Sequence, residues 1–364
     1  MKLIWASVRK ASDLCSTTTF SLLEGLSQRG HEITFLSPKP FDENTPWTNI
    51  ELQQSTVKGF HASSLAASAR DWFKALPVDG NQCIIIDWPL ASKLGAHLNK
   101  FGHRVLLMDR SPPADPSIFG KLQWRHWKRA WSMVDRGVFS DGFVVSEAHA
   151  SFAGKYCRRR NCIHILPAGV DTELFQPISK PTDLEAPSFV YHGRLDKHRG
   201  VLALPLLVQQ LRTSGKKATL TLIGEGDAVR GLQNIADNNS WFSIIETLKK
   251  EELANQLANH DIGLLPMPDS TVWRLASPLK RSEYLSSGLL VYGIQHAGNQ
   301  LSEQEEGWMK LVDRSIFHEA CEPWIDSLAN VDVSQLRNDA RSYALKKLNW
   351  NITVDVIEQL LVKN

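Results

Sequence analysis

Short apolar runs alternate with longer amphipathic stretches along most of this 364-residue chain. The runs have the length of buried strands, and the stretches between them carry apolar positions at helical spacing. The alternation starts again at Phe189 and continues through the second half. Strands and helices that alternate in this way are typical of parallel α/β sheets. In the first half the pattern predicts strands at 3–8, 31–37, 83–87, 103–109, 142–146 and 162–167, helices at 16–30, 62–76 and 121–135, and an irregular segment at 38–60; a long helical pattern at 336–363 is interrupted near residue 350.

The length of the chain and a polar segment near its middle predict two domains. A chain of 364 residues exceeds one ordinary hydrophobic core. The segment SKPTDLEAP is rich in residues that favour loops and suits a linker. We therefore expect an N-terminal domain of residues 1–178, completed by a C-terminal helix at 343–364, and a second domain of residues 179–342.

The composition indicates a globular protein of the cytoplasm. Hydrophobic residues make up 43% and charged residues 22% of the chain, which is ordinary for such proteins. The five cysteines are scattered and odd in number, which favours a reducing compartment and gives no metal-binding spacing. No run approaches the roughly 18 apolar residues of a membrane helix. Any membrane contact is therefore expected to be peripheral, on the inner face.

A basic, tryptophan-rich helix is predicted from residue 121 onward. Residues 121–160 hold nine Lys or Arg and three Asp or Glu. One interpretation is a platform for a membrane surface or a lipid-linked acceptor, because Trp and Arg suit the headgroup layer. The other is a helix whose tryptophans pack on the first sheet while its cations face water. No nucleic-acid-binding motif accompanies the patch, so nucleic acid is not expected as a partner. The candidates are Trp124, Arg125, Trp127, Lys128 and Trp131.

The second half opens with YHGRLDKHRG, which places cations directly after a predicted strand. Ligands of doubly wound sheets bind at the carboxyl ends of the strands. Gly193 lets the backbone approach a ligand closely, and Arg194 and Arg199 can hold a diphosphate and stabilise it as a leaving group. The alternative is a solvated charged loop.

Two further strand ends carry candidate ligand-binding residues. The motif LIGEGD holds Gly224, Glu225 and Gly226, and we expect the glycines to admit a sugar or phosphate and the carboxylate to hold hydroxyls. The third glycine of a dinucleotide fingerprint is missing, which disfavours an NAD-dependent enzyme. Base recognition is expected from the backbone around Thr247 and Leu248.

The third candidate element is SPLKRSEYLSSG, which has the features of a helix start. Ser277 is predicted to cap this helix, with the amides of Leu279 and Lys280 facing an anion. Glu283 follows on the same helix, where its carboxylate is expected to accept the hydroxyls of a ribose. An exposed helical glutamate is the alternative for Glu283.

GRLDKHRG, LIGEGD and SPLKRSEYLSSGLLVYG together resemble the donor domain of retaining GT-B glycosyltransferases of the family 4 type. The resemblance implies two Rossmann-like domains facing a central cleft. It also implies transfer of a sugar from a nucleotide diphosphate sugar to a saccharide or lipid-linked acceptor, with retention of configuration. The diphosphate would be held by Arg194, Arg199 and Lys280, and the ribose by Glu283. No cofactor is implied, and no Asp-x-Asp motif for a metal is found.

The chain departs from the family pattern at three places. Arg199 stands where a lysine is usual, and Leu275 stands where the first of two glutamates is expected. The loop after residue 109 often carries a sugar-binding histidine in the family, but here Asp109 and Arg110 occupy it. These two are candidates by position only, and a structural salt bridge is the alternative. The departures leave two other functions open: a catalytically degenerate nucleotide-sugar-binding protein, and a nucleotide-sugar epimerase of the same fold.

Overall fold

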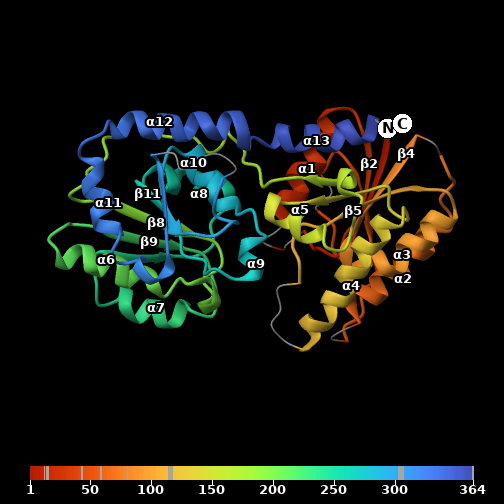
Figure 1. The fold of residues 1–364 in the computed structure, drawn as a ribbon, viewed down its shortest axis with the longest axis horizontal. Coiled ribbons are helices and arrows are strands. Elements are labelled where there is room, and N and C mark those ends of the chain that lie inside the picture. The colour runs from red at the N-terminus through yellow and green to blue at the C-terminus, as the bar shows by residue number, and fades with distance from the viewer. Residues whose placement is uncertain are drawn as a thin grey trace. The chain divides into compact units, whose positions relative to one another are not determined.

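The chain forms two compact units, each built around one parallel sheet with helices on both faces (Figure 1). The computed structural model describes residues 1–11, 13, 16–41, 44–57, 60–79, 81–113, 118–301 and 307–362. The first unit comprises Met1–Pro167 together with Trp350–Asn364, and the second comprises Ala168–Asn349.

The first unit contains a seven-stranded sheet in the order β3-β2-β1-β4-β5-β6-β7, with parallel neighbours. Every residue of β4 is buried, because helices cover both faces of the sheet. The strands are β1 (Lys2–Ala6), β2 (Glu32–Ser37), β3 (Thr48–Glu51), β4 (Gln82–Asp87), β5 (Arg104–Met108), β6 (Asp141–Val144) and β7 (Ile163–Ile165); the helices are α1 (Ser16–Gln28), α2 (His61–Phe73), α3 (Trp88–Lys100), α4 (Ile118–Asp135) and α5 (Glu147–Ala153).

Two elements of this unit differ from the sequence prediction. The segment 38–60, predicted to be irregular, contains β3, a half-exposed edge strand of four residues without apolar alternation. Helix α3 follows β4 without a break and begins with Trp88 and Pro89. Its buried residues Leu90, Leu94 and Leu98 recur at helical spacing, so the sequence carried a signal for α3 that the prediction missed, whereas β3 has none.

The second unit contains a six-stranded parallel sheet in the order β10-β9-β8-β11-β12-β13. Its interior holds the larger of the two apolar clusters described for the chain. The strands are β8 (Ser188–His192), β9 (Thr219–Ile223), β10 (Phe242–Ile245), β11 (Ile262–Leu265), β12 (Leu290–Ile294) and β13 (Met309–Val312); the helices are α6 (Ala203–Thr213), α7 (Val229–Ala236), α8 (Lys250–Ala258), α9 (Thr271–Arg274), α10 (Leu279–Ser286), α11 (Cys321–Leu328) and α12 (Val333–Tyr343).

The strand order in both sheets reverses next to the first strand of the unit. In the second unit this switch lies between β8 and β11, whose neighbours on the other sides are β9 and β12. Open α/β sheets bind ligands at such a switch, outside the carboxyl ends of the strands. A ligand site is therefore expected in the loops after β8 and β11.

The C-terminal helical pattern is interrupted where the sequence predicts it. Helix α12 passes into a π-helical turn at Ala344–Leu348, and α13 (Trp350–Val362) follows Asn349. Helix α13 packs on α1, and Arg29 forms ion pairs of 2.6 Å with Asp355 and 2.5 Å with Glu358. The C-terminal helix thus belongs to the first unit.

The boundaries of the units lie several residues from those expected at 178 and 343. The segment that follows Pro167 already packs on the second unit: the amide of Ala168 donates to Ser277 Oγ (3.0 Å), and Ser286 Oγ donates to the carbonyl of Phe175 (2.6 Å). The polar stretch at 179–187 therefore lies inside the second unit. Within the described ranges, no helix has the length and apolar character needed to cross a membrane.

Candidate functional site

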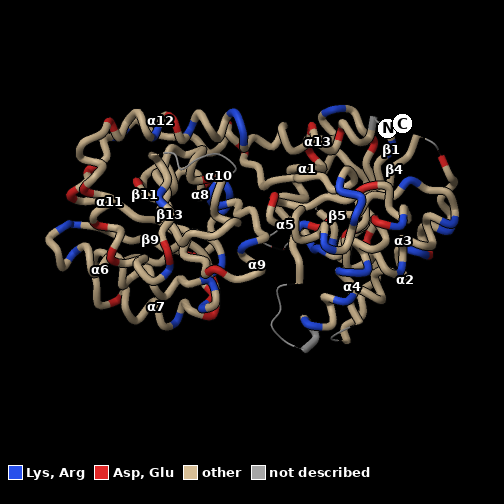
Figure 2. Tube along the Cα trace, viewed as in Figure 1, with Lys and Arg blue, Asp and Glu red and all other residues tan. Residues whose placement is uncertain are grey.

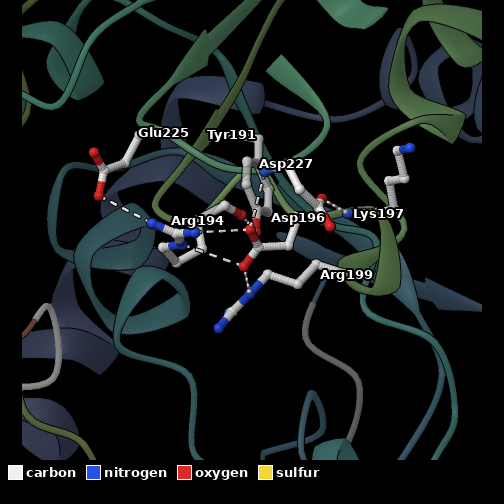
Figure 3. A network of polar contacts seen from close by, with 7 residues as sticks. All are labelled: Tyr191, Arg194, Asp196, Lys197, Arg199, Glu225 and Asp227. Atoms are coloured by element: carbon white, nitrogen blue, oxygen red, sulfur yellow. Dashed lines mark hydrogen bonds and ion pairs between the residues drawn. The ribbon is translucent and has the colours of Figure 1, made fainter. Parts of the chain in front are cut away.

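The loop after β8 holds Arg194 in a fixed orientation. Gly193 has a φ of +105°, a conformation that favours glycine, and it turns the chain out of the strand. The guanidinium of Arg194 donates to both oxygens of Asp196 (3.2 Å and 3.0 Å) and to Glu225 Oε1 (2.9 Å), as Figure 3 shows. The hydrogen bond with Asp196 is the main cause that raises the pKa of Arg194. Arg194 is thus a preorganised cation whose side chain is 36% exposed.

Arg199 is held from two sides. Its Nε lies 3.5 Å from Asp196 Oδ2, and its guanidinium carbon lies 4.8 Å above the ring of Trp273 on α9 (Figure 3 for the Asp196 pair). Burial raises the pKa of Asp196, but the hydrogen bonds from Arg194 and from the Asp227 amide outweigh it, so the net pKa is lowered. The ionised carboxylate therefore links the two predicted diphosphate-binding arginines.

The glycines of the β9 loop have a packing role. A Cβ on Gly224, where φ is +136°, would lie 2.1 Å from the carbonyl oxygen of Gly193, and one on Gly226 would lie 2.3 Å from the carbonyl carbon of Leu195. Both positions require glycine because the β8 loop crosses them closely. This explains the motif without a ligand. Glu225 between them is 65% exposed at its side chain and pairs with Arg194.

Helix α10 begins one residue later than the sequence predicts. Its N-cap is Pro278, without a side-chain capping bond, and the helix starts at Leu279. The predicted cap at Ser277 is wrong, because its hydroxyl instead accepts the amide proton of Ala168. The first amides of a helix point along its axis and favour an anion, and in α10 these are the amides of Leu279 and Lys280.

Lys280 lies against the loop after β8. Its Nζ is 4.9 Å from the centre of the Tyr191 ring and 3.6 Å from the position that a Cβ of Gly193 would take. The predicted cations of two separate motifs therefore meet at the carboxyl end of β8, next to the switch in strand order.

Glu283 is buried, so the alternative of an exposed helical glutamate is wrong. The residue is 7% exposed, and its Oε2 lies 3.0 Å from His192 Nε2. The ring of Tyr284 packs edge-on against His192, and its hydroxyl accepts the His192 amide proton (3.3 Å). His192 was not among the site residues predicted from the sequence. Its only signal is a histidine at the last position of a strand that is otherwise apolar.

The predicted base region lies at the carboxyl end of β10, which is two strands away from β8. Thr247 is exposed, and Leu248 is half-buried against the core of the unit. No hydrogen bond of the described residues marks this loop as a base site beyond its place at the sheet edge.

In the first unit Asp109 lies inside the protein. Its Oδ2 accepts hydrogen bonds from the indoles of Trp127 (2.5 Å) and Trp131 (2.8 Å) and lies 3.0 Å from His149 Nε2. Asp109 and His149 are both completely buried. Asp109 is enclosed between β5, α4 and α5, and neither of its oxygens is exposed to solvent in this structure. Arg110 donates to the carbonyl of Leu166 (2.9 Å) and is half-buried.

Helix α4 turns its tryptophans inward and its cations outward. Trp127 and Trp131 are completely buried, and Trp124 is half-buried against the same core. The tryptophans therefore pack on the first unit, which was one of the two interpretations of this helix. Lys and Arg recur along α4 (Figure 2). The exposed basic residues of α4 are Lys121, Arg125, Lys128 and Arg129.

The predicted site residues fall into two groups, one in each unit. Gly193, Arg194, Arg199, Lys280 and Glu283 surround the end of β8 in the second unit, with Glu225 beside Arg194. Asp109, Arg110 and α4 form a separate group in the first unit. Among the residues that the structure describes, no cluster of three or more His, Cys, Asp or Glu could hold a metal ion.

Comparison with solved structures identifies the fold. Sucrose-phosphate synthase from Thermosynechococcus elongatus aligns with a TM-score of 0.78 and 15% identity over 99% of this chain and 98% of that one. WaaG, a glycosyltransferase involved in lipopolysaccharide biosynthesis, aligns with a TM-score of 0.72 and 12% identity over 100% of both chains. Anabaena HepE, solved in complex with UDP-glucose, gives the same values. No family model matches the chain, and no curated protein matches it in sequence.

The two parallel α/β sheets and the full-length alignments define a GT-B fold. The fold expected from the sequence is therefore confirmed. Identities of 12–15% establish the architecture, and the function has to be argued from the residues at the end of β8.

Proposed function

We propose that this protein is a retaining glycosyltransferase. It transfers a sugar from a nucleotide diphosphate sugar to a hydroxyl of a saccharide or lipid-linked acceptor. The observation that carries the proposal is the meeting of Arg194, Arg199, Lys280 and Glu283 at the switch point of the second sheet. The UDP-glucose complex of HepE, which has the same fold, supports a nucleotide sugar as the donor.

In this proposal the cations act on the leaving group. As the bond between the sugar C1 and the diphosphate oxygen breaks, negative charge grows on the diphosphate. Arg194, Arg199 and the amides at the start of α10 are fixed donors that stabilise this charge without reorganising. The acceptor oxygen bonds to C1 on the same face, and its proton passes to the leaving diphosphate. No metal is needed for these steps.

The outer face of α4 is proposed to attract an anionic membrane surface, where a lipid-linked acceptor would be found. Its exposed cations are contributed at about one per helical turn, and juxtamembrane Lys or Arg each add about 1 kcal/mol near an anionic bilayer. The buried tryptophans do not take part. Reversal of Arg125, Lys128 and Arg129 to Glu is expected to abolish sedimentation with phosphatidylglycerol vesicles and to leave phosphatidylcholine unaffected. The control reverses the exposed Lys217 and Arg230 of the second unit.

The activity is tested by measuring turnover of the donor with acceptor and subtracting its hydrolysis without acceptor. The protein is incubated with UDP-, GDP- and ADP-sugars and a panel of saccharide and polyprenyl acceptors, and release of the nucleoside diphosphate is measured with and without EDTA. We expect acceptor-dependent release from one nucleotide class that EDTA does not reduce. Binding of a nucleotide sugar without release in any acceptor would instead favour the degenerate binding protein.

One observation favours that second candidate. Leu275, at the position of the missing glutamate, is 4% exposed, so an apolar side chain is buried where the family has a carboxylate. An epimerase would need acid and base groups at the sugar. Asp109, the one such candidate from the sequence, is enclosed by Trp127, Trp131 and His149.

A further inference from the structure

A buried histidine and a buried carboxylate face each other beside the proposed donor site. His192 is the last residue of β8, and Glu283 projects from α10. Their side chains are 10% and 9% exposed, and His192 Nε2 lies 3.0 Å from Glu283 Oε2. The two atoms are not aligned as a hydrogen bond, and among the described residues neither has another hydrogen-bond partner. Buried polar atoms are seldom left in this state.

Neighbouring residues fix the orientation of the His192 ring and give the Glu283 carboxylate one charged partner. Tyr284 packs its ring edge-on against His192, with 5.3 Å between ring centres, and its hydroxyl accepts the His192 amide proton. Glu283 sits on helix α10, whose residues 281–286 are all buried. A buried carboxylate is costly unless a donor or a cation stands beside it. Of the described residues, His192 is the one that forms an ion pair with Glu283.

We propose that His192 is a positioning residue for Glu283 and thereby sets the preference of the site for ribose over deoxyribose. The imidazole holds Oε2 of the carboxylate, so that Oε1 is presented in one orientation to the 2′- and 3′-hydroxyls of the donor nucleoside. This inference rests on the proposed function, because it takes Glu283 as the residue that binds the ribose.

The role is separate from that of the cations. Arg194 and Lys280 act on phosphate, which ribo- and deoxyribonucleotides share, whereas Glu283 acts on hydroxyls that only the ribonucleotide carries. A residue that orients Glu283 therefore changes the ratio of the two affinities. A residue that merely supports the fold changes both affinities alike.

The test measures the dissociation constants of the nucleoside diphosphate that binds best among UDP, GDP and ADP, and of its 2′,3′-dideoxy analogue, by calorimetry. The ratio of the two constants is compared in the wild type and in Glu283→Ala, His192→Leu and His192→Gln. Glutamine keeps a donor in the side chain, whereas leucine keeps only the bulk. If His192→Leu does not fold, His192→Asn replaces it, because its shorter amide does not reach Glu283.

We expect the ratio to fall by about tenfold in His192→Leu, close to its value in Glu283→Ala, because the buried carboxylate loses the ion-pair partner that holds Oε2. The affinity for the dideoxy analogue should stay within twofold, and His192→Gln should restore most of the ratio. Suppose that Glu283→Ala lowers the ratio but His192→Leu leaves it unchanged. That result overturns the inference, whether or not His192→Leu weakens both affinities equally. An unchanged ratio in Glu283→Ala itself overturns the ribose role of Glu283 and the inference with it.

Discussion

Single residues decide how strongly the site can attract a diphosphate. Arg194 is already paired with Asp196 and Glu225, so two carboxylates compete with any anion that approaches it. Asp196 is largely buried and also touches Arg199, which makes it part of the framework. Glu225 is mostly exposed, and exposed ion pairs are weak. Glu225 is therefore the carboxylate that a diphosphate would displace.

Replacement of Glu225 by alanine is expected to tighten nucleoside diphosphate binding by up to about fivefold, because the lost surface ion pair is worth at most about 1 kcal/mol. Calorimetry with the diphosphate and with the nucleotide sugar checks this. If Glu225 also holds sugar hydroxyls, as the sequence suggests, only the nucleotide sugar will lose affinity. Glu251→Ala on α8 is the control. Weaker binding of the diphosphate itself would show that Glu225 assists phosphate binding.

Asp109 is expected to be structural. Asp109→Ala leaves the Trp127 and Trp131 indoles and His149 without their acceptor, so the free energy of unfolding should fall by about 3 kcal/mol. Asp109→Asn keeps one oxygen for these donors and should cost less. Denaturant unfolding of both variants, with nucleotide binding measured alongside, checks this. A catalytic Asp109 would give the opposite pattern: a stable Asp109→Asn protein without activity.

Among the elements, α9 and α10 connect the site to the interior. Arg281 on α10 is 5% exposed, and its Nη1 donates to the carbonyls of Gly298 (3.1 Å), Asn299 (2.9 Å) and Gln300 (2.6 Å). Burial lowers the pKa of Arg281 to about 10. A Cβ on Gly298 would lie 1.9 Å from the carbonyl oxygen of Trp273, so the loop anchored by Arg281 supports α9. Trp273 in turn packs on Arg199.

Arg281→Leu is expected to weaken nucleotide binding through this chain of contacts. It should also destabilise the protein by about 3 kcal/mol, because two buried carbonyls and one partly buried carbonyl lose their donor. The matched control is Arg337→Leu on α12. Arg337 is also buried and donates to the Gly288 carbonyl, but its helix supplies none of the proposed ligand-binding side chains and has no contact with Trp273 or Arg199 among the interactions described. Calorimetry and unfolding of both variants check this. Equal nucleotide affinity in the two would contradict the link from Arg281 to Arg199.

The sequence predicts the elements whose signals are local. Buried parallel strands read as apolar runs, so β1, β4, β5 and β8 were expected close to where they lie, and the cations after β8 followed from the end of that strand. The short edge strand β3 has no comparable signal, whereas α3 has buried leucines at helical spacing and was overlooked. Contacts between distant segments could not be predicted from the sequence. Trp127 of α4 donates to Asp109, 18 positions away, and His192 pairs with Glu283, 91 positions away.

At the scale of the whole molecule, the chain builds two independent sheets and uses its C-terminus to complete the first. Helix α13 buries Val354 against α1, where a Cβ on Gly25 would lie 2.7 Å from Val354 Cγ2. The nucleotide site proposed above lies wholly in the second unit. A substitution that disrupts packing between α1 and α13 should therefore lower stability and leave nucleotide affinity nearly unchanged.

Gly25→Leu is expected to destabilise the first unit by about 1–3 kcal/mol through overpacking. Thermal unfolding combined with limited proteolysis should locate the loss in residues 1–167, and the nucleotide dissociation constant should stay within twofold. Gly231→Leu on α7 is the control, because a Cβ there meets no atom within 4 Å. A matching loss of nucleotide affinity in Gly25→Leu would show that the site depends on the first unit.

The proposed donor site is tested most directly by the binding of nucleoside diphosphates at the end of β8, where the strand order of the second sheet reverses. Thermal shifts are measured with UDP, GDP, ADP and their sugar conjugates on the wild type, Arg194→Ala and Glu283→Ala. A ligand at 100 times its dissociation constant should stabilise the wild type by about 2.7 kcal/mol. We predict a shift with one nucleotide class that both variants lose. No shift with any nucleotide, or a shift that both variants keep, would contradict the assignment of the site.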